Sequence, residues 1–233
     1  MSGRGGPSSA VLVGAAIAAL LLLGAGAAEA AQDDGETPPP PYPPPPPPDG
    51  FVTGDAMGFD MPTGVDLESQ LAAFLYMIRS AEHVPAAVRT GRDYATFYGG
   101  AQFKNFADHP VITGELKGVP LPDAMCAAAG LGPGCVSTAA GAYQIIKPTW
   151  QRIREAGRYG PRIPDFSPAS QDEAARRLLI ESGALAQLDA GNVPAAIQKA
   201  SKLWASLPGS TAKQNPKSVD TVLAYFANAG GVA

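Results

Sequence analysis

A run of proline divides this chain. Ten of the eleven residues at positions 38–48 are proline. Because proline has no backbone N–H donor and a fixed φ, the run cannot form a helix or a central strand and favours extended polyproline II. At about 3.1 Å per residue it is a semi-rigid spacer of roughly 30 Å. We interpret it as a stalk, with a docking motif for a proline-binding partner as the alternative.

The segment before the prolines has the features of an export signal. After Arg4, residues 10–28 form the uncharged run AVLVGAAIAALLLLGAGAA, and Ala28-Glu29-Ala30 is a small-x-small site that suits signal peptidase. The run is just long enough to span a bilayer, but its alanine and glycine make it a weak anchor. We therefore predict export to the periplasm or cell envelope, through a cleaved signal or a temporary anchor in the inner membrane.

Composition limits the remaining possibilities. The chain has 233 residues, enough for one mid-sized domain after these segments. Its net charge of −4 provides no basic field, so we expect no nucleic-acid partner. Two histidines and two cysteines without ligand spacing predict no metal site. No glycine-rich nucleotide loop and no G-x-S-x-G motif is present, so we expect no cofactor.

The predicted organisation is a signal peptide or signal anchor over residues 1–31, a proline-rich linker over residues 32–60, and one α+β domain over residues 61–233. Most of the domain is expected to be helical. Tyr94 to Phe106, YATFYGGAQFKNF, predicts one small β-hairpin around the paired glycines. Caps and prolines predict helices from Asp66 to Glu82, at PTWQRIREAG, from Ser167-Pro168 to Gly183, after Asn192, and between Asn215-Pro216 and Gly230-Gly231.

Two cysteines, Cys126 and Cys135, bracket the sequence AAAGLGPG. In an exported chain, a pair this close with glycine and proline between predicts a disulfide that closes a surface loop. For a loop of this size the bond is worth roughly 2–3 kcal/mol.

The predicted helix from Asp66 to Glu82 ends in a glutamate, and this residue is the most informative feature for function. Glu82 follows the apolar positions Leu71, Leu75 and Ile78 at intervals of four, three and four residues, so it lies on the apolar face. Burial and the negative end of the helix dipole both disfavour the ionised carboxylate. Such a glutamate can hold a proton near neutral pH and deliver it, as a general acid must do when it protonates a glycosidic oxygen. A solvated or capped glutamate is the alternative.

Six segments in the same order resemble one known family. They are FLYMIRSAEH, YATFYGG, FADHP, STAAGAYQI, FSPASQDEAARRLLIESGAL and LWASLPG, and they span roughly residues 70–230. The chain is similar through them to the lambda-type phage endolysins, which are lysozyme-like lytic transglycosylases. The resemblance implies a lysozyme-like fold and peptidoglycan glycan strands as the substrate and partner.

The resemblance also implies a reaction. The family's essential acid falls on Glu82, which would cleave the β-1,4 bond between N-acetylmuramic acid and N-acetylglucosamine and leave a 1,6-anhydro end. A hydrolysing muramidase would normally need a second carboxylate across the bond. The candidates are Asp93 and Asp108. The lambda-type proteins have an aspartate after the tyrosine that matches Tyr94, where this chain has Ala95, so no second acid is transferred by position and hydrolysis stays open.

Further residues are substrate-binding candidates, two of them by this resemblance and the others by their position. Tyr143 and Gln144 match a motif that lines the sugar cleft, although a core tyrosine and a surface amide are the alternatives. Ser137 and Thr138 could reach the same cleft or cap a helix. His109 is a candidate for substrate contact or a turn residue.

The sequence leaves two alternatives open for the biological role of the protein. A non-catalytic wall-binding protein on the same fold is the competing class, and an intact Glu82 argues against it. The export segment could also hold the enzyme at the inner membrane until release, with phage lysis or wall remodelling as the purpose.

Overall fold

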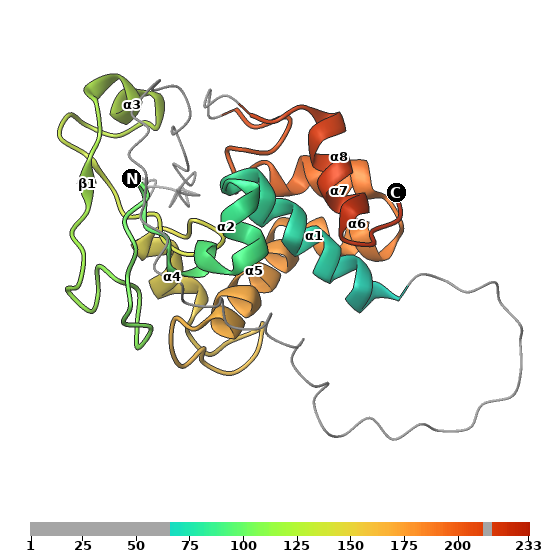
Figure 1. Cartoon of the computed structure of the whole chain (residues 1–233), viewed down its shortest axis with the longest axis horizontal. Coiled ribbons are helices and arrows are strands. Elements are labelled where there is room, and N and C mark those ends of the chain that lie inside the picture. The colour runs from blue at the N-terminus through green and yellow to red at the C-terminus, as the bar shows by residue number, and fades with distance from the viewer. Residues whose placement is uncertain (1–65, 212–215) are drawn as a thin grey trace, which may run out of the picture.

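The structure is a computed structural model, and it describes residues 66–211 and 216–233 (Figure 1). The predicted export segment and proline-rich linker lie outside the described residues, as do residues 61–65 of the predicted domain. Within the described part, no helix combines the length and apolar character needed to cross a bilayer.

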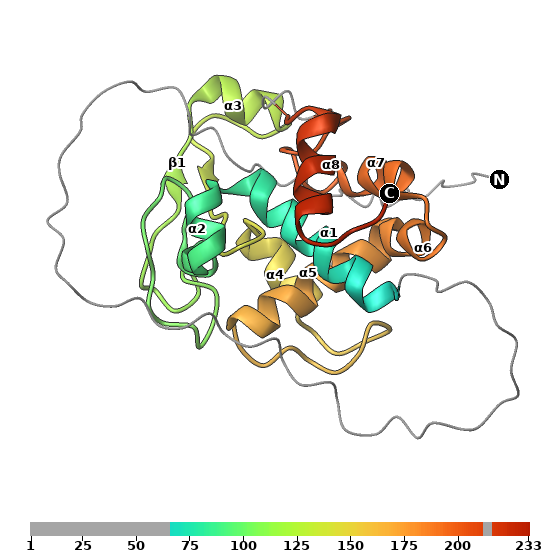
Figure 2. The ribbon, with the colours of Figure 1, turned by 45° about the vertical axis from the view of Figure 1, so that its right-hand side comes forward.

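A central helix organises the domain. This helix, α1 (Leu67–Glu82), begins at the predicted cap, where the Asp66 carboxylate accepts a hydrogen bond from the N–H of Ser69 at 3.3 Å. It ends when His83 adopts an extended conformation. In both views, α2 (Pro85–Thr90) lies on one side of α1, and α6 (Ala184–Asp189) and α8 (Val219–Asn228) lie on the other (Figures 1 and 2).

The other predicted helices are confirmed. Pro148 lies in the first turn of α4 (Lys147–Ile153), and Gly183 ends α5 (Pro168–Ser182) in a left-handed conformation. Asn192 caps α7 (Val193–Ala200) by accepting from the N–H of Ala195. The sequence did not predict four short elements, because four to six residues are too few for a periodic apolar pattern. They are α2, a 3₁₀ helix at Arg92–Ala95, α3 (Asp123–Ala128) and α6.

The small sheet differs from the predicted hairpin. Its strands, β1 (Val119–Pro120) and β2 (Val136–Ser137), pair antiparallel. The chain does reverse at Gly99-Gly100, whose φ angles of 88° and 90° suit glycine, but only the bridge between Thr96 and Gln102 flanks this turn. The expected first strand is lost because its beginning, Tyr94 and Ala95, belongs to the 3₁₀ helix.

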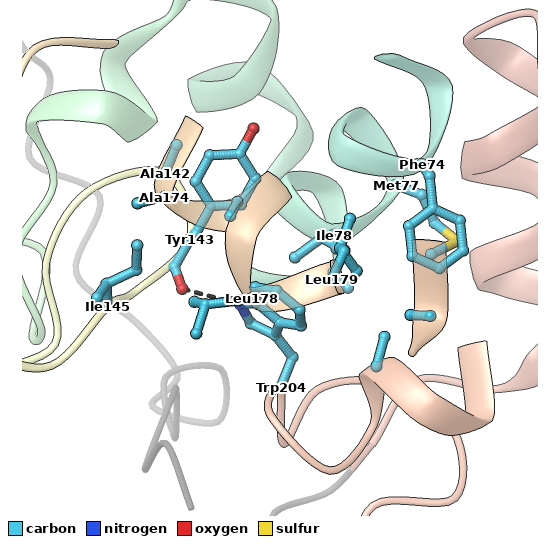
Figure 3. Packing of buried hydrophobic residues seen from close by; sticks show 14 of the residues in the cluster. Phe74, Met77, Ile78, Ala142, Tyr143, Ile145, Ala174, Leu178, Leu179 and Trp204 are labelled. Carbon is cyan, nitrogen blue, oxygen red and sulfur yellow. Dashed lines mark hydrogen bonds between the residues drawn. The ribbon is translucent and has the colours of Figure 1, made fainter. Parts of the chain in front are cut away.

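One hydrophobic core joins the helices. Phe74, Met77 and Ile78 of α1 belong to one buried cluster with Leu178 and Leu179 of α5, and Ile78 lies beside Leu179 (Figure 3). The largest fully buried side chains include two tryptophans, Trp150 and Trp204. This core places the carboxyl end of α1 in the interior rather than at the surface.

The predicted disulfide is present. Cys126, in α3, is bonded to Cys135, just before β2. A second small cluster forms here from Leu121 and Cys126, against which Tyr98 and Met125 pack. In both views α3 lies near β1, at one end of the molecule (Figures 1 and 2).

Candidate active site

Glu82 is the last residue of α1 and is only 7% exposed. Its two oxygens have different surroundings. Oε1 accepts a hydrogen bond from the hydroxyl of Ser206, whereas Oε2 is buried and has no hydrogen-bond partner among the described residues. A buried polar atom without a partner costs free energy, and such atoms in native proteins often serve chemistry.

Burial raises the pKa of Glu82 from 4.5 to about 7. Hydrogen bonding from the hydroxyl of Ser206, the positive charge of Lys217 and hydrogen bonding from the backbone of Ser206 act in the opposite direction and only partly offset the loss of water. The carboxyl group is therefore divided between its protonated and ionised forms near neutral pH. It can donate a proton to one group and accept a proton from another, as acid–base catalysis requires.

The segment that carries Ser206 is fixed on both sides. Two residues earlier, the indole Nε1 of Trp204 donates to the carbonyl oxygen of Tyr143 at 3.0 Å (Figure 3). The N–H of Lys217 donates to the carbonyl oxygen of Ser206 at 2.8 Å. Ser206 is thus held against the end of α1 by contacts that do not depend on its own side chain.

A tight turn at residues 141–144 anchors the end of α1. The ring Nε2 of His83 lies 3.1 Å from the carbonyl oxygen of Gly141. The Gln144 side-chain amide donates to the carbonyl oxygens of Gly141 and Thr96 at 3.0 and 3.2 Å. Gly141 has φ of 75°, and a Cβ there would lie 2.1 Å from the side-chain oxygen of Gln171, so only glycine fits. Gln144 is buried, and its amide serves this turn.

Tyr143 lies in the core. Its hydroxyl donates to Asp172 Oδ1 at 2.6 Å, and the hydroxyl of Tyr94 donates to the same oxygen at 2.7 Å. Burial raises the pKa of Tyr143 well above its usual value. This arrangement gives Tyr143 a packing role, and substrate contact by its phenol stays a prediction without support from the geometry.

Asp93, one candidate for a second carboxylate, is 0% exposed and is engaged by a cation. Arg79 donates to it twice, from Nε at 2.6 Å and from Nη2 at 3.1 Å. The same guanidinium stacks over the ring of Tyr94 at 4.3 Å. Both oxygens of Asp93 are therefore used within the protein.

Asp108, the other candidate, is also engaged. It forms an ion pair with Arg154, and Oδ1 accepts from the indole of Trp150 and from the N–H of His109, each at 2.7 Å. Burial alone would raise the pKa of Asp108, but these hydrogen bonds outweigh it and lower the pKa below its usual value.

His109 is fully buried, and both ring nitrogens have partners. Nδ1 accepts from the N–H of Val111 at 3.3 Å, so Nε2 carries the proton and donates to the carbonyl oxygen of Ile145 at 3.1 Å. Burial lowers the pKa of His109 to about 4. The ring is thus a neutral core group, and the predicted substrate contact finds no support here.

Ser137 and Thr138 serve the backbone. The Ser137 hydroxyl accepts from the N–H of Ala139 at 3.3 Å, and the Thr138 hydroxyl accepts from the N–H of Lys147 at 3.0 Å. Lys147 is the first residue of α4, so Thr138 has the capping role that the sequence left as its alternative.

Of the predicted site residues, only Glu82 combines burial with a carboxylate oxygen that has no hydrogen-bond partner among the described residues. Sequence reasoning missed Ser206, which is 124 positions away along the chain. The segment LWASLPG is one of the six that resemble the family, but no local sequence pattern identifies its serine as a partner of Glu82. Among residues 66–211 and 216–233, no group of three His, Cys, Asp or Glu side chains could hold a metal ion.

A mostly helical domain with a small sheet and one buried glutamate ending its central helix is lysozyme-like. The family model described as Endolysin matches residues 72–233. The endolysin of Escherichia phage lambda is 33% identical over 171 residues, covering 72% of this chain and 95% of that protein. The endolysin of Escherichia phage P2 is 32% identical over 174 residues, covering 72% and 97%.

Solved structures agree with this similarity. Bacteriophage lambda lysozyme complexed with a chitohexasaccharide matches with a TM-score of 0.57 and 34% identity, covering 73% of this chain and 99% of the other. A second structure of lysozyme from bacteriophage lambda matches with a TM-score of 0.54 and 31% identity over the same shares. The chain belongs to the endolysin family, and it is a lysozyme-like enzyme that degrades peptidoglycan.

Proposed function

We propose that this endolysin is a lytic transglycosylase, which cleaves the β-1,4 bond between N-acetylmuramic acid and N-acetylglucosamine and leaves a 1,6-anhydro end. The observation that carries this proposal is the isolation of Glu82. It has a raised pKa of about 7 and one oxygen without a partner, and no other acid in the described part of the site has both features.

One carboxyl group is sufficient for this reaction. Protonated Glu82 donates its proton to the glycosidic oxygen as the bond to the muramoyl anomeric carbon breaks. Ionised Glu82 then accepts the proton of the muramoyl 6-hydroxyl, whose oxygen bonds to the same anomeric carbon. The enzyme returns to its starting state, and no water is consumed. A pKa near the working pH suits a group that performs both steps.

The surroundings of Asp93 and Asp108 support a mechanism with one acid. A nucleophile or a water-activating base needs an oxygen that is free of strong partners. Both oxygens of Asp93 accept hydrogen bonds from Arg79, and Asp108 is held by Arg154 and Trp150. Hydrolysis through a second carboxylate is therefore the weaker alternative, because either aspartate would first have to leave its partners.

A glycan strand is the proposed substrate and binding partner. The lambda lysozyme structure contains a chitohexasaccharide, and 34% identity over nearly all of that chain supports the same class of ligand here. A non-catalytic wall-binding role has less support, because a buried and unpaired carboxylate costs stability that binding alone does not require.

Mass spectrometry of the products tests the reaction directly. Purified peptidoglycan would be digested with the enzyme and with its Glu82→Gln variant. We expect 1,6-anhydro muropeptides from the enzyme and none from the variant. Reducing ends that disappear in the variant would establish hydrolysis instead, and products from the variant at the normal rate would contradict the role of Glu82.

We also propose that the chain is exported to the periplasm or cell envelope, where its substrate lies, and that cell lysis is its purpose. The uncharged run at residues 10–28 motivates this proposal. Sequencing the N-terminus of the active protein distinguishes two routes. A mature chain beginning at Ala31 indicates a cleaved signal, whereas an active soluble protein that keeps Met1 indicates release of a temporary membrane anchor.

A further inference from the structure

The two oxygens of Glu82 are not equivalent. Oε1 accepts a hydrogen bond from the hydroxyl of Ser206, and Oε2, although buried, accepts none from the residues that the structure describes. A neutral carboxyl group has one carbonyl oxygen, which accepts, and one hydroxyl oxygen, which carries the proton. As long as Ser206 donates to Oε1, the proton of neutral Glu82 is carried by Oε2.

We propose that Ser206 is the positioning residue for Glu82, holding Oε1 so that Oε2 is the oxygen that delivers and recovers the catalytic proton. The inference rests on the proposed acid–base role of Glu82 and adds the orientation that this role needs. The proposed role of Ser206 is the same whether the 6-hydroxyl or water attacks the sugar. In either reaction, Oε2 gives its proton to the glycosidic oxygen and later accepts a proton from the attacking group.

The hydrogen bond is well placed to fix the orientation. Without a partner on Oε1, the carboxyl group could turn about its last side-chain bond and exchange its two oxygens, because this torsion has a broad preference. A misdirected acid loses much of the advantage of its position. Ser206 prevents this exchange, and its own backbone is fixed through Trp204 and Lys217.

Other charged groups near Glu82 do not supply this orientation. Lys217 lowers the pKa of Glu82 through its charge, but no hydrogen bond joins the two side chains in the described structure. Arg79, one turn earlier on α1, is directed to Asp93, and the ring of His83 is directed to Gly141. Ser206 is thus the group that distinguishes Oε1 from Oε2.

The test compares the full-length enzyme with its Ser206→Ala and Ser206→Thr variants. The alanine variant should have kcat reduced roughly 10-fold on peptidoglycan with little change in KM, because orientation and not binding is lost. It should also raise the pKa of Glu82, because the serine hydroxyl favours the ionised form. Carbon-13 NMR of the Glu82 carboxyl group measures this pKa, and the pH profile of kcat should follow it.

Ser170→Ala is the matched control. Ser170 is 7% exposed, as Ser206 is, and its hydroxyl also donates to a carboxylate, Asp165 Oδ1, at 2.6 Å. Its partner has no part in the proposed reaction, so this variant should keep the parent kcat and pH profile. Ser206→Thr keeps a hydroxyl at the site and should restore most of both properties, and circular dichroism would show that each variant is folded.

Three results would overturn the inference. They are an unchanged kcat in Ser206→Ala, a reduced kcat without a change in the pKa of Glu82, and equal losses in Ser170→Ala. None of them depends on the product chemistry that tests the proposed function. Failure of the proposed function would be seen differently. Glu82→Gln would then keep its activity, or the products would lack 1,6-anhydro ends, independently of the results for the Ser206 variants.

Discussion

Glu82 and Asp93 are both buried acids in contact with α1, yet their partners differ. Asp93 receives two hydrogen bonds from the guanidinium of Arg79, which neutralises its charge. Glu82 receives one hydrogen bond from a neutral hydroxyl, and burial raises its pKa to about 7. Burial alone therefore does not make an acid catalyst. The partner decides whether a buried carboxylate is a fixed structural charge or a group that exchanges protons.

The largest expected effect comes from removing the proton of Glu82. Glu82→Gln keeps the shape of the side chain but cannot transfer a proton. We expect the rate of peptidoglycan cleavage to fall by roughly 1,000-fold or more, equivalent to about 4 kcal/mol of barrier. Release of soluble muropeptides measures the rate. Asp93→Asn is the comparison, and a similar loss in that folded variant would make Asp93 a second catalytic acid.

Breaking the ion pair between Asp93 and Arg79 should lower the stability of the protein more than its catalytic rate. Asp93→Ala leaves the partly buried charge of Arg79 without its partner, and we expect the free energy of unfolding to fall by about 3–5 kcal/mol. Urea denaturation measures this loss. Arg152→Ala, which breaks a pair exposed at 52% and 30%, is the control and should cost about 1 kcal/mol or less. Equal effects of the two changes would show that burial of the Asp93 pair is unimportant.

The pH dependence of stability should distinguish Glu82 from the ion-paired Asp93. The pKa of Glu82 is about 7 in the folded protein against 4.5 as the reference, so between these values the folded state binds more protons. Its contribution to stability is full below about pH 4.5 and is lost as pH rises through 7, a change of about 3 kcal/mol. Glu82→Gln cannot titrate, so it should gain stability over the parent as pH rises. Unfolding curves near pH 5 and pH 8 measure this difference, and a constant difference would contradict the raised pKa.

The smallest effect is expected at Asp108. Its side chain is 21% exposed, so water partly replaces what the ion pair with Arg154 provides. Asp108→Asn keeps an oxygen for Trp150 and the N–H of His109 but leaves Arg154, whose side chain is 7% exposed, without its counter-charge, and it should cost about 2–3 kcal/mol. Thermal denaturation measures the cost, and activity per folded molecule should remain near the parent value. A complete loss of activity would favour hydrolysis with Asp108 as the second carboxylate.

Local signals predicted much of the fold. The caps at Asp66 and Asn192 and the αL stop at Gly183 act through neighbouring backbone groups, so their effect can be recognised within a few residues. The disulfide was also predictable from the short spacing of its two cysteines. The hairpin was only half predictable. The paired glycines made the turn, but the 3₁₀ helix before it contains Asp93, whose partner Arg79 lies 14 positions earlier in the chain.

For the site, the amino-acid sequence by itself determined that Glu82 lies on the apolar face at the end of a helix, because helical periodicity places it there. Only the tertiary structure decided which acids keep a free oxygen. Arg79, Arg154 and Ser206 reach their carboxylate partners across 14, 46 and 124 positions of the chain. Such contacts depend on how helices pack, and packing is a property of the whole core and not of any local sequence pattern.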